Sequence, residues 1–518
     1  MNFLDALLAA LPILVVLALM VFAKRSAALA GAFGLLTSVV LAATYFDPGT
    51  AAAPGLVRPL VGAGAEAAFT AGTILWIIFG ALCIYQLQQK THALEQLRSA
   101  LSSLSDDPRI VVILVAWFFA LFSEGAAGFG TAVALSAPFL VGFGFRPADA
   151  VVITMLGHGI GVSFGAVGIP TLAQAELVPF DGDAISVPTA TFHALIGWVM
   201  LVAMLRVATG DDEPSESDTD PKPHIWRWAA VAAACYLVPM YVIARFVGPE
   251  LPTLGGSLAG GLLFVGLYRW FGGKKEAEQG NEMDAAKMET GTVLRAAAPY
   301  LAVIALVLLT RLVAPIADTL GAVTWSWSLW ERFEGSMQPI LHPGTILIAG
   351  FLIGAVAQRA TVEEVKDSTL EALRQLLPVA LALGAMLGLS RVMAHSGMIE
   401  ALAAFTAVAA GSAWPFFSPW VGMLGTFVTG SATASNILFS EFQLSTTTRL
   451  SMPALTLLGT QNVGAAVGSI VAPSKIIAGG ATVGIAGEEG SILRRLIGPA
   501  ALYIGLTGIM ALVAVYLL

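Results

Sequence analysis

The chain has 518 residues, of which 57% are apolar and 12% are charged, and its formal net charge is −8. Soluble proteins carry about 25% charged residues, so this composition, with a mean hydropathy of +0.82, excludes a soluble enzyme, a disordered scaffold, a nucleic-acid binder and a secreted disulfide module. Cys83 and Cys235 show neither CxxC nor Cys/His spacing, so we predict no metal site and no cofactor.

Apolar segments long enough to cross a bilayer recur along the chain, since a crossing needs about 20 apolar residues. We predict twelve spans: 4–22, 25–46, 69–88, 148–170, 192–208, 226–247, 252–271, 293–314, 343–358, 373–392, 451–472 and 493–517. The first is predicted to be a span rather than a secretory signal peptide, because Lys24 and Arg25 follow it directly without a small-residue cleavage site. The expected fold class is an all-α polytopic membrane protein.

Basic residues collect at one end of the predicted spans. If the N-terminus lies outside, Lys24, Arg25 and Arg206 fall with most other basic residues on one side, whereas the other side keeps only a few, such as Arg58 and Arg311. Cytoplasmic loops are enriched in Lys and Arg. We therefore predict a multi-pass protein of a prokaryotic inner membrane with both termini external.

Two charged segments, 209–224 and 272–291, interrupt the apolar pattern and are predicted to be cytoplasmic linkers. They flank the pair of spans within 226–271, which has the character of an insertion between two halves. The predicted organisation is therefore a first half over 1–208, a linker region with its inserted helix pair over 209–291, and a second half over 292–518.

The two halves match each other at a shift of about 303 residues. The corresponding pairs are His158 with Gln461, Gly161 with Gly464, Gly165 with Gly468, and Pro170 with Pro473. In the predicted topology, span 69–88 runs inward whereas its partner, span 373–392, runs outward. The halves are therefore predicted to be inverted repeats, which are typical of secondary transporters that work by alternating access.

Each half contains one segment whose pattern does not predict a full membrane crossing, at 110–145 and at 413–448. In both, two apolar arms of about 13–15 residues, or about 20 Å of helix, flank a turn rich in glycine and hydroxyl groups, at 123–131 and at 429–436. Such a turn at membrane depth must be buried in protein or line a wet cavity. We predict two re-entrant hairpins that enter from opposite faces.

The hairpin turns and the spans that follow them supply the candidate substrate-binding residues. A helix N-terminus offers free N–H groups and a partial positive charge of about +0.5, which suit a carboxylate. Breaks in the spans at 157–161 and 460–464 would add further helix ends. The candidates are Ser123, Gly125, Gly128, Gly130, Thr131, Gly430, Ser431, Thr433, Ser435, Asn436, Gln461 and Asn462. The alternative is that the glycines only allow close helix packing.

Ionisable residues at membrane depth are functional candidates. Glu124 at the first turn and His158 in the following span are predicted to couple transport to protons, although either could have a purely structural hydrogen bond instead. Lys475 would neutralise the bound carboxylate or extend to the membrane surface. Arg391 and His395 are expected at an outer rim, and Glu441 is expected to pair with a basic neighbour.

Trp325, Trp327 and Trp330 are expected in an external loop at the membrane interface.

Several motifs carry a family resemblance that covers nearly the whole chain. The stretch SEGAAGFGTAVALSAPFLVGFGFRPADAV resembles the first hairpin of the lactate permease family, and GSATASN, TQNVGAAVGSIVAPSKIIAG and GIAGEEGSILRR are similar to matching family segments. The resemblance implies import of L-lactate, D-lactate or glycolate with protons. Asn436 is also similar to hairpin-tip asparagines of elevator-type carboxylate transporters, which implies motion of the repeats against a homodimeric scaffold.

The leading hypothesis is a proton-coupled symporter for a small 2-hydroxy-monocarboxylate. One alternative couples transport to sodium through carbonyls at unwound helix ends. A membrane-embedded enzyme would use the arrangement of Ser123 beside Glu124 with His158, which lacks a plausible further catalytic partner. A passive channel is another alternative, and it would carry its solute without concentrating it.

Overall fold

The computed structural model describes residues 3–46, 57–102, 105, 107–128, 130–210, 225–271, 290–485 and 487–517. Over these residues the chain is helical apart from one β-hairpin, and eleven helices are long and apolar enough to cross a membrane, or up to twelve if the bent pair at 182–209 is one span. The predicted all-α polytopic class is confirmed. The predicted linkers at 209–224 and 272–291 lie almost entirely outside the described residues.

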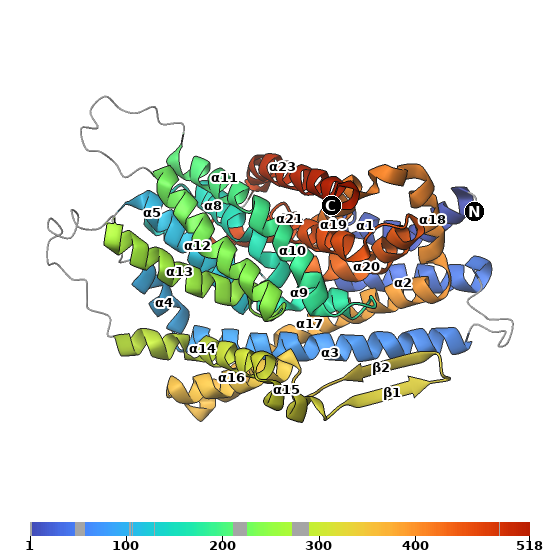
Figure 1. Ribbon diagram of the computed structural model, residues 1–518, viewed down its shortest axis with the longest axis horizontal. Helices are drawn as coiled ribbons and strands as arrows, with labels where there is room; N and C mark the ends of the chain where they lie inside the picture. Colours follow the sequence, from blue (N-terminus) through green and yellow to red (C-terminus); the bar gives the residue numbers. More distant parts are fainter. Residues whose placement is uncertain are drawn as a thin grey trace.

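The helices form two groups, which lie in the lower and upper parts of Figure 1 except for α1 and α18 at the right. We call the first group the frame. It consists of α1 (Phe3–Val21), α2 (Ala27–Leu41, extended by a π-helical turn at Ala42–Phe46), α3 (Val57–Lys90), α4 (Ala93–Ser102), α14 (Thr290–Leu312), α15 (Ala314–Gly321), α16 (Pro343–Ala357), α17 (Val362–His395), α18 (Met398–Ala410) and the strands β1 (Trp325–Leu329) and β2 (Phe333–Met337).

We call the second group the bundle. Its first part consists of α5 (Pro108–Val112), a π-helical segment (Ile113–Phe119), α6 (Ala120–Ala126), α7 (Thr131–Gly142), α8 (Pro147–His158), a 3₁₀ segment (Gly159–Phe164), α9 (Gly165–Ala175), α10 (Gly182–Ile196), α11 (Trp198–Thr209), α12 (Ile225–Phe246) and α13 (Pro252–Phe271). Its second part consists of α19 (Trp414–Thr429, preceded by a 3₁₀ turn at Gly411–Ala413), α20 (Ala432–Arg449), α21 (Ala454–Gly468), α22 (Pro473–Thr482) and α23 (Glu489–Tyr516).

Helix packing in the frame follows the same plan in the two halves of the chain. The long helices α3 and α17 pack against each other at its centre. Helix α2 packs on α17 and α1 packs on α2, while α16 packs on α3 and α14 packs on α16. Likewise α1 contacts α18 and α14 contacts α4.

Both segments predicted as re-entrant form helical hairpins whose arms pack against each other. In the first, α5, the π-helical segment and α6 make one arm of 19 residues and α7 makes the other, with the turn at residues 127–130. In the second, α19 and α20 meet at Gly430 and Ser431. Only the 12 residues of α7 are close to the predicted arm length. The 19-residue arm of the first hairpin and the 16 and 18 residues of α19 and α20 exceed it, and the 19-residue arm is one of the eleven helices long enough to cross a membrane.

Turn residues explain why the hairpin arms end where they do. Gly430 has a left-handed φ of 72° and its N–H donates to Thr426 O at 2.8 Å, which closes α19. The next residue, Ser431, caps α20 through its Oγ, which accepts from the Ala434 N–H. In the first hairpin, Gly128 and Gly130 have φ values of 62° and 85°, conformations that glycine adopts without steric cost.

The span that follows the first hairpin is broken, as predicted. Helix α8 ends at His158, a 3₁₀ segment follows, and Ala166, Val167 and Gly168 then have left-handed φ values of 45°, 58° and 83°. A non-glycine residue held there costs about 1–3 kcal/mol, and such strain is common at functional sites. The predicted break at 460–464 is wrong, because α21 is continuous to Gly468 and the interruption comes at 469–472.

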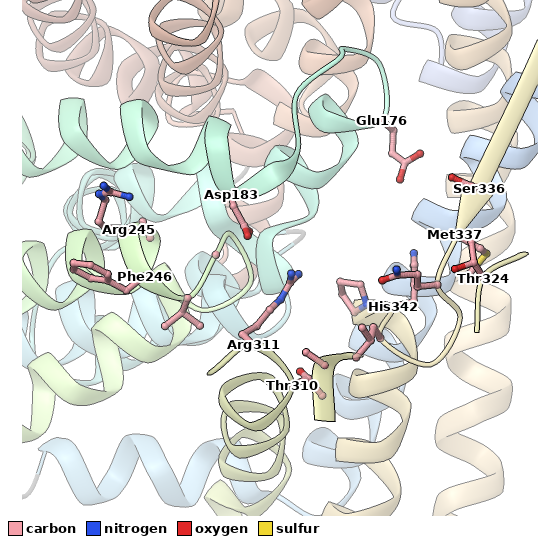
Figure 2. Close-up of a pocket in the computed structure, with 17 residues that line it drawn as sticks. Glu176, Asp183, Arg245, Phe246, Thr310, Arg311, Thr324, Ser336, Met337 and His342 are labelled. Atoms are coloured by element: carbon pink, nitrogen blue, oxygen red, sulfur yellow. The ribbon is translucent and has the colours of Figure 1, made fainter. Parts of the chain in front are cut away.

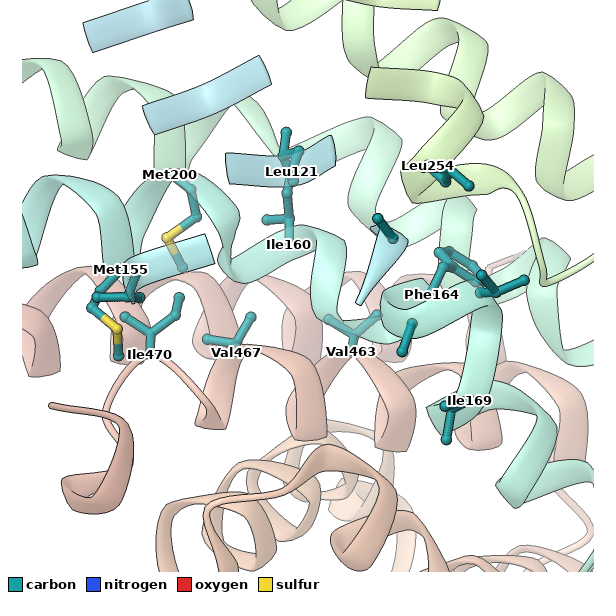
Figure 3. Close-up of a cluster of buried hydrophobic side chains, with 14 of the residues drawn as sticks. Leu121, Met155, Ile160, Phe164, Ile169, Met200, Leu254, Val463, Val467 and Ile470 are labelled. Atoms are coloured by element: carbon teal, nitrogen blue, oxygen red, sulfur yellow. The ribbon is translucent and has the colours of Figure 1, made fainter. Parts of the chain in front are cut away.

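The two spans pack against each other through apolar side chains (Figure 3). Ile160 and Phe164 of the 3₁₀ segment are fully buried beside Val463 and Val467 of α21. Gly159 leaves room for Ile470, since a Cβ at Gly159 would lie 2.3 Å from the Ile470 Cδ1 atom. This apolar cluster holds the broken first-half span against its second-half counterpart.

Three details of the sequence analysis change. The tryptophan-rich segment is an antiparallel hairpin in which Trp325 pairs with Met337, and its strand β2 packs on α3, so it is not a loop. Helices α13 and α16 are predicted as spans, but they are not among the eleven helices that are long and apolar enough to cross a membrane. The inserted helix pair, α12 and α13, packs on α10 and α6 of the first half.

Candidate functional site

A cavity of about 520 Å³ lies between the tips of the two hairpins. Its wall also includes the first broken span, α22 and the frame helices α3 and α17. The predicted site residues that line it are Glu124, Gly128, Gly130, Thr131, Gly430, Ser431, Thr433 and Lys475. Residues more than 300 positions apart in the sequence are therefore brought into one cavity, whose wall combines these groups with apolar side chains.

The N-terminal ends of helices α7, α20 and α22 lie at this cavity. Helix α7 begins at Thr131, α20 begins after its cap Ser431, and α22 begins at Pro473, immediately before the lining residues Ser474 and Lys475. The first turn of each helix leaves backbone N–H groups without intrahelical acceptors and carries a partial positive charge. Helix N-termini that meet at one cavity can bind an anion such as a carboxylate.

The ionisable side chains of the wall have opposite charges. Glu124 is 2% exposed, and its Oε2 atom has no hydrogen-bond partner in the part of the chain that the structure describes. Lys475 is partly buried and forms no ion pair with a described residue. Buried polar atoms usually have hydrogen-bond partners, so the unpartnered Oε2 makes Glu124 a candidate for contact with a bound substrate.

Three other predicted residues lie behind the cavity wall. His158 is completely buried, its Nδ1 lies 2.7 Å from the Thr154 carbonyl oxygen, and its Nε2 has no partner among the described residues. Ser123 is buried and its Oγ is also unpartnered there, so the two side chains do not form a nucleophile–base pair. Gly125 packs against the backbone of Leu254.

The predicted amides form a buried hydrogen-bond network beneath the cavity instead of lining it. The Asn436 Nδ2 donates to Pro170 O and to Asn462 Oδ1, both at 3.0 Å. The Asn462 Nδ2 donates to Thr171 Oγ1 at 2.7 Å, and Gln461 Nε2 donates weakly to Asn436 Oδ1 at 3.4 Å. The network therefore joins the second hairpin and α21 to the broken span of the first half.

The remaining predicted residue, Ser435, also has a structural partner. It is completely buried, and its Oγ donates to Gly422 O in the other arm of the same hairpin at 2.8 Å. The bond fixes the spacing of α19 and α20 close to the tip. Ser435 is placed to support the turn that Ser431 and Thr433 present to the cavity.

Sequence reasoning missed several residues of the site. Tyr85 and Gln375 reach the cavity from the frame, and no local motif marks them. Ser474 also lines it, and its signal was present: the internal shift of 303 residues pairs it with Thr171, another hydroxyl.

A buried chain of polar side chains was also missed. Ser163 Oγ lies 2.9 Å from His193 Nε2, and His193 Nδ1 lies 2.8 Å from the Tyr503 hydroxyl. All three residues are buried. They connect the broken span to α10 and α23.

An ion-pair cluster joins the frame to the bundle away from the cavity. Arg391 of α17 donates through Nη1 to Glu441 of α20 at 3.0 Å and lies 3.7 Å from Glu66 of α3. Its Nη2 donates to the Glu176 carbonyl oxygen at 2.9 Å, and His395 contacts Glu66 at 2.8 Å. The predicted pairing of Glu441 with a basic neighbour is confirmed.

A second cavity, of about 600 Å³, also lies between frame and bundle, but none of the predicted site residues lines it (Figure 2). Arg311 of α14 extends toward Asp183 of α10 and forms an ion pair with Glu250 in the turn between α12 and α13. Burial lowers the pKa of His342, at the start of α16, to about 4. Because the predicted residues of both hairpin turns line the first cavity and not this one, the first cavity is the candidate site.

The chain is similar to known proteins along most of its length. The family described as L-lactate permease matches residues 5–337 and 335–518. The L-lactate permease of Streptococcus iniae is 29% identical, with 86% of this chain and 92% of that protein aligned. The glycolate permease GlcA of Escherichia coli (strain K12) is 26% identical over 99% of this chain and 96% of its own. The solved structure of the YdaH transporter of Alcanivorax borkumensis aligns with 88% of this chain and 87% of its own, at 16% identity and a TM-score of 0.48.

Proposed function

This chain belongs to the L-lactate permease family, and from that premise we propose that it is a secondary transporter that imports a small 2-hydroxy-monocarboxylate together with protons. L-lactate, D-lactate and glycolate are the proposed substrates. The proposal draws on relatives named for lactate and for glycolate that align along most of the chain.

The observation that carries the proposal is the single cavity between the two hairpin tips. The substrate carboxylate would bind the first-turn N–H groups of α20 and α22, with Lys475 as its charge partner. Ser431 and Thr433 would add hydroxyl donors, and Thr131 would meet the opposite end of the substrate. The hydroxyl on C2 would then be recognised by side chains of the wall.

Proton coupling is assigned to Glu124. Its Oε2 atom has no hydrogen-bond partner among the described residues, and its side chain lines the cavity that would hold the substrate. With Lys475 positive and Glu124 protonated, binding of one monocarboxylate leaves the site with no net charge, which reduces the cost of carrying it through the low-dielectric interior. His158 is the alternative proton carrier and lies behind the wall.

Alternating access would arise from movement of the bundle against the frame. The paired packing of α2 on α17 and of α16 on α3, and of α1 on α2 and of α14 on α16, supports two inverted repeats. In an elevator-type motion the contacts of Arg391 with Glu441 and with the Glu176 carbonyl would separate. We propose that the frame forms a homodimer in the inner membrane, with both chain termini outside.

Uptake of radiolabelled lactate by proteoliposomes tests the proposal. A pH gradient at fixed sodium should drive accumulation above the external concentration, and a sodium gradient at fixed pH should not. Accumulation driven only by sodium would contradict proton coupling, and equilibration without accumulation would indicate a channel. Competition by the lactate enantiomers, glycolate, pyruvate and a dicarboxylate would then define the substrate.

A further inference from the structure

The turn of the inserted helix pair lies against the first hairpin and the broken span. Pro249 and Glu250 precede α13, and Thr253 and Leu254 stand in its first turn. Thr253 and Leu254 are completely buried, and Glu250 is 1% exposed. The segment 249–254, which we call the insertion turn, is therefore part of the protein interior.

Three glycines make this close approach of backbones feasible. A Cβ at Gly125, next to Glu124, would lie 2.5 Å from the Leu254 nitrogen, and a Cβ at Gly168 would lie 2.5 Å from the Pro249 carbonyl oxygen. At Gly161 it would lie 2.8 Å from the Thr253 Cγ2 atom. Distances under 3.0 Å are almost never seen for real Cβ atoms, so the insertion turn occupies the space that side chains would need.

Thr253 gives the Gly161 carbonyl a donor from outside the broken span. In an α-helix the Gly161 carbonyl would accept from the Gly165 N–H, but that N–H donates to Val162 O instead. The Thr253 Oγ1 donates to Gly161 O at 2.8 Å. Beside this contact, the Tyr236 ring of α12 packs edge-on against Trp117 of the first hairpin.

The geometry of this break determines where the Glu124 carboxyl lies. A Cβ at Gly165 would lie 2.8 Å from Glu124 Oε1, so the backbone that ends the 3₁₀ segment directly adjoins that carboxyl. Val162, Gly165 and Ala166 line the cavity with it. If the span rewound from Gly161 to Gly165, this part of the wall would move.

We propose that Thr253 is a positioning residue for transport: its hydroxyl donates to the Gly161 carbonyl within the 3₁₀ segment, ties that segment to the insertion turn, and so holds Glu124 and the adjoining wall in place. The inserted helix pair then contributes to the geometry of the transport site. This inference deepens the proposed function, since it assigns a new residue to the same cavity.

The kinetic test compares Thr253→Val with Thr253→Ser in proteoliposomes. Valine keeps the shape but loses the hydroxyl, and we expect the KM for lactate to rise about tenfold and the pH of half-maximal uptake to shift. Serine should restore both to within about twofold of the wild type. The control is Ser257→Ala on the next turn of α13, where Ser257 Oγ donates only to Leu254 O of its own helix.

A second measurement needs no substrate. Hydrogen exchange of the segment 159–168 in the substrate-free protein should change at least about fivefold in Thr253→Val and remain unchanged in Thr253→Ser and Ser257→Ala. Unchanged exchange in Thr253→Val would overturn the positioning role, whatever the transport data show. If the wild type does not carry lactate at all, the proposed function fails, while the exchange result still decides the role of Thr253.

Discussion

The two hairpin regions that form the cavity differ in how they hold their geometry. The first combines the ionisable Glu124 with a span that is unwound over 159–168 and is supported by the insertion turn. The second has no ionisable group at its tip and continues into the regular helix α21. Amides and hydroxyls of its own hold it, including Asn436 and Ser431.

This contrast indicates a division of roles between two similar halves. Unwinding exposes backbone groups and brings the chain close to Glu124, the residue for which we propose the proton-carrying role. The second half supplies the ordered helix starts of α20 and α22 and the charge of Lys475, which suit a carboxylate. The predictions below test this division, from the largest expected effect to the smallest.

Removing the amide of Asn436 should have the largest effect, because both halves depend on it. In Asn436→Ala, Pro170 O and Asn462 Oδ1 each lose a buried donor, at a cost of about 1–3 kcal/mol per unsatisfied group. We expect lactate uptake to fall below about 1% of wild type while membrane insertion is retained. Thr448→Ala, on the exposed face of the same helix, is the control. Normal uptake by Asn436→Ala would refute this account.

Glu124→Gln tests the proton role of the first half. The amide cannot be ionised, so we expect accumulation driven by a pH gradient to fall at least about tenfold, with exchange of internal for external lactate preserved. Proteoliposome uptake and exchange assays measure both quantities. The matched control is Glu400→Gln, at an exposed position on α18. Undiminished pH-driven accumulation in Glu124→Gln would transfer the role to His158.

Lys475→Met tests the carboxylate role of the second half. Loss of the charge should raise the KM for lactate about tenfold, which corresponds to about 1.4 kcal/mol, with little change in maximal rate. Lys475→Arg should recover part of the affinity. Lys366→Met, at an exposed position on α17, serves as the control. An unchanged KM in Lys475→Met would mean that this lysine only reaches toward the membrane surface.

The smallest difference is expected between the two turn glycines. Gly130→Ala and Gly430→Ala both force a side chain into the left-handed region, at about 1–2 kcal/mol each. A Cβ at Gly130 meets open space, whereas at Gly430 it would lie 2.3 Å from Ser474 Oγ. Both variants should therefore lose similar thermal stability, and only Gly430→Ala should raise the KM, by about threefold. Equal KM values would argue against a substrate contact of Ser474.

Local sequence patterns predict much of the fold. Runs of apolar residues place most of the long helices, and the glycine and hydroxyl clusters place the two hairpin turns at 127–130 and 430–431. The predicted break near Gly464 fails because glycine permits a break without requiring one. In the first half the break is held by contacts from another part of the chain.

The sequence by itself determined the membrane class, the turns and the residue types of an anion site, because apolar runs and turn-forming residues act over a few neighbouring positions. Only the tertiary structure decided that Glu124, Ser431 and Lys475 share one cavity, that Asn436 supports that cavity from beneath, and that Thr253 reaches the broken span. These relations join segments about 90 to 350 residues apart. They depend on how the helices pack and on which buried polar groups form hydrogen bonds with each other. Neighbouring residues in the sequence do not specify these long-range contacts.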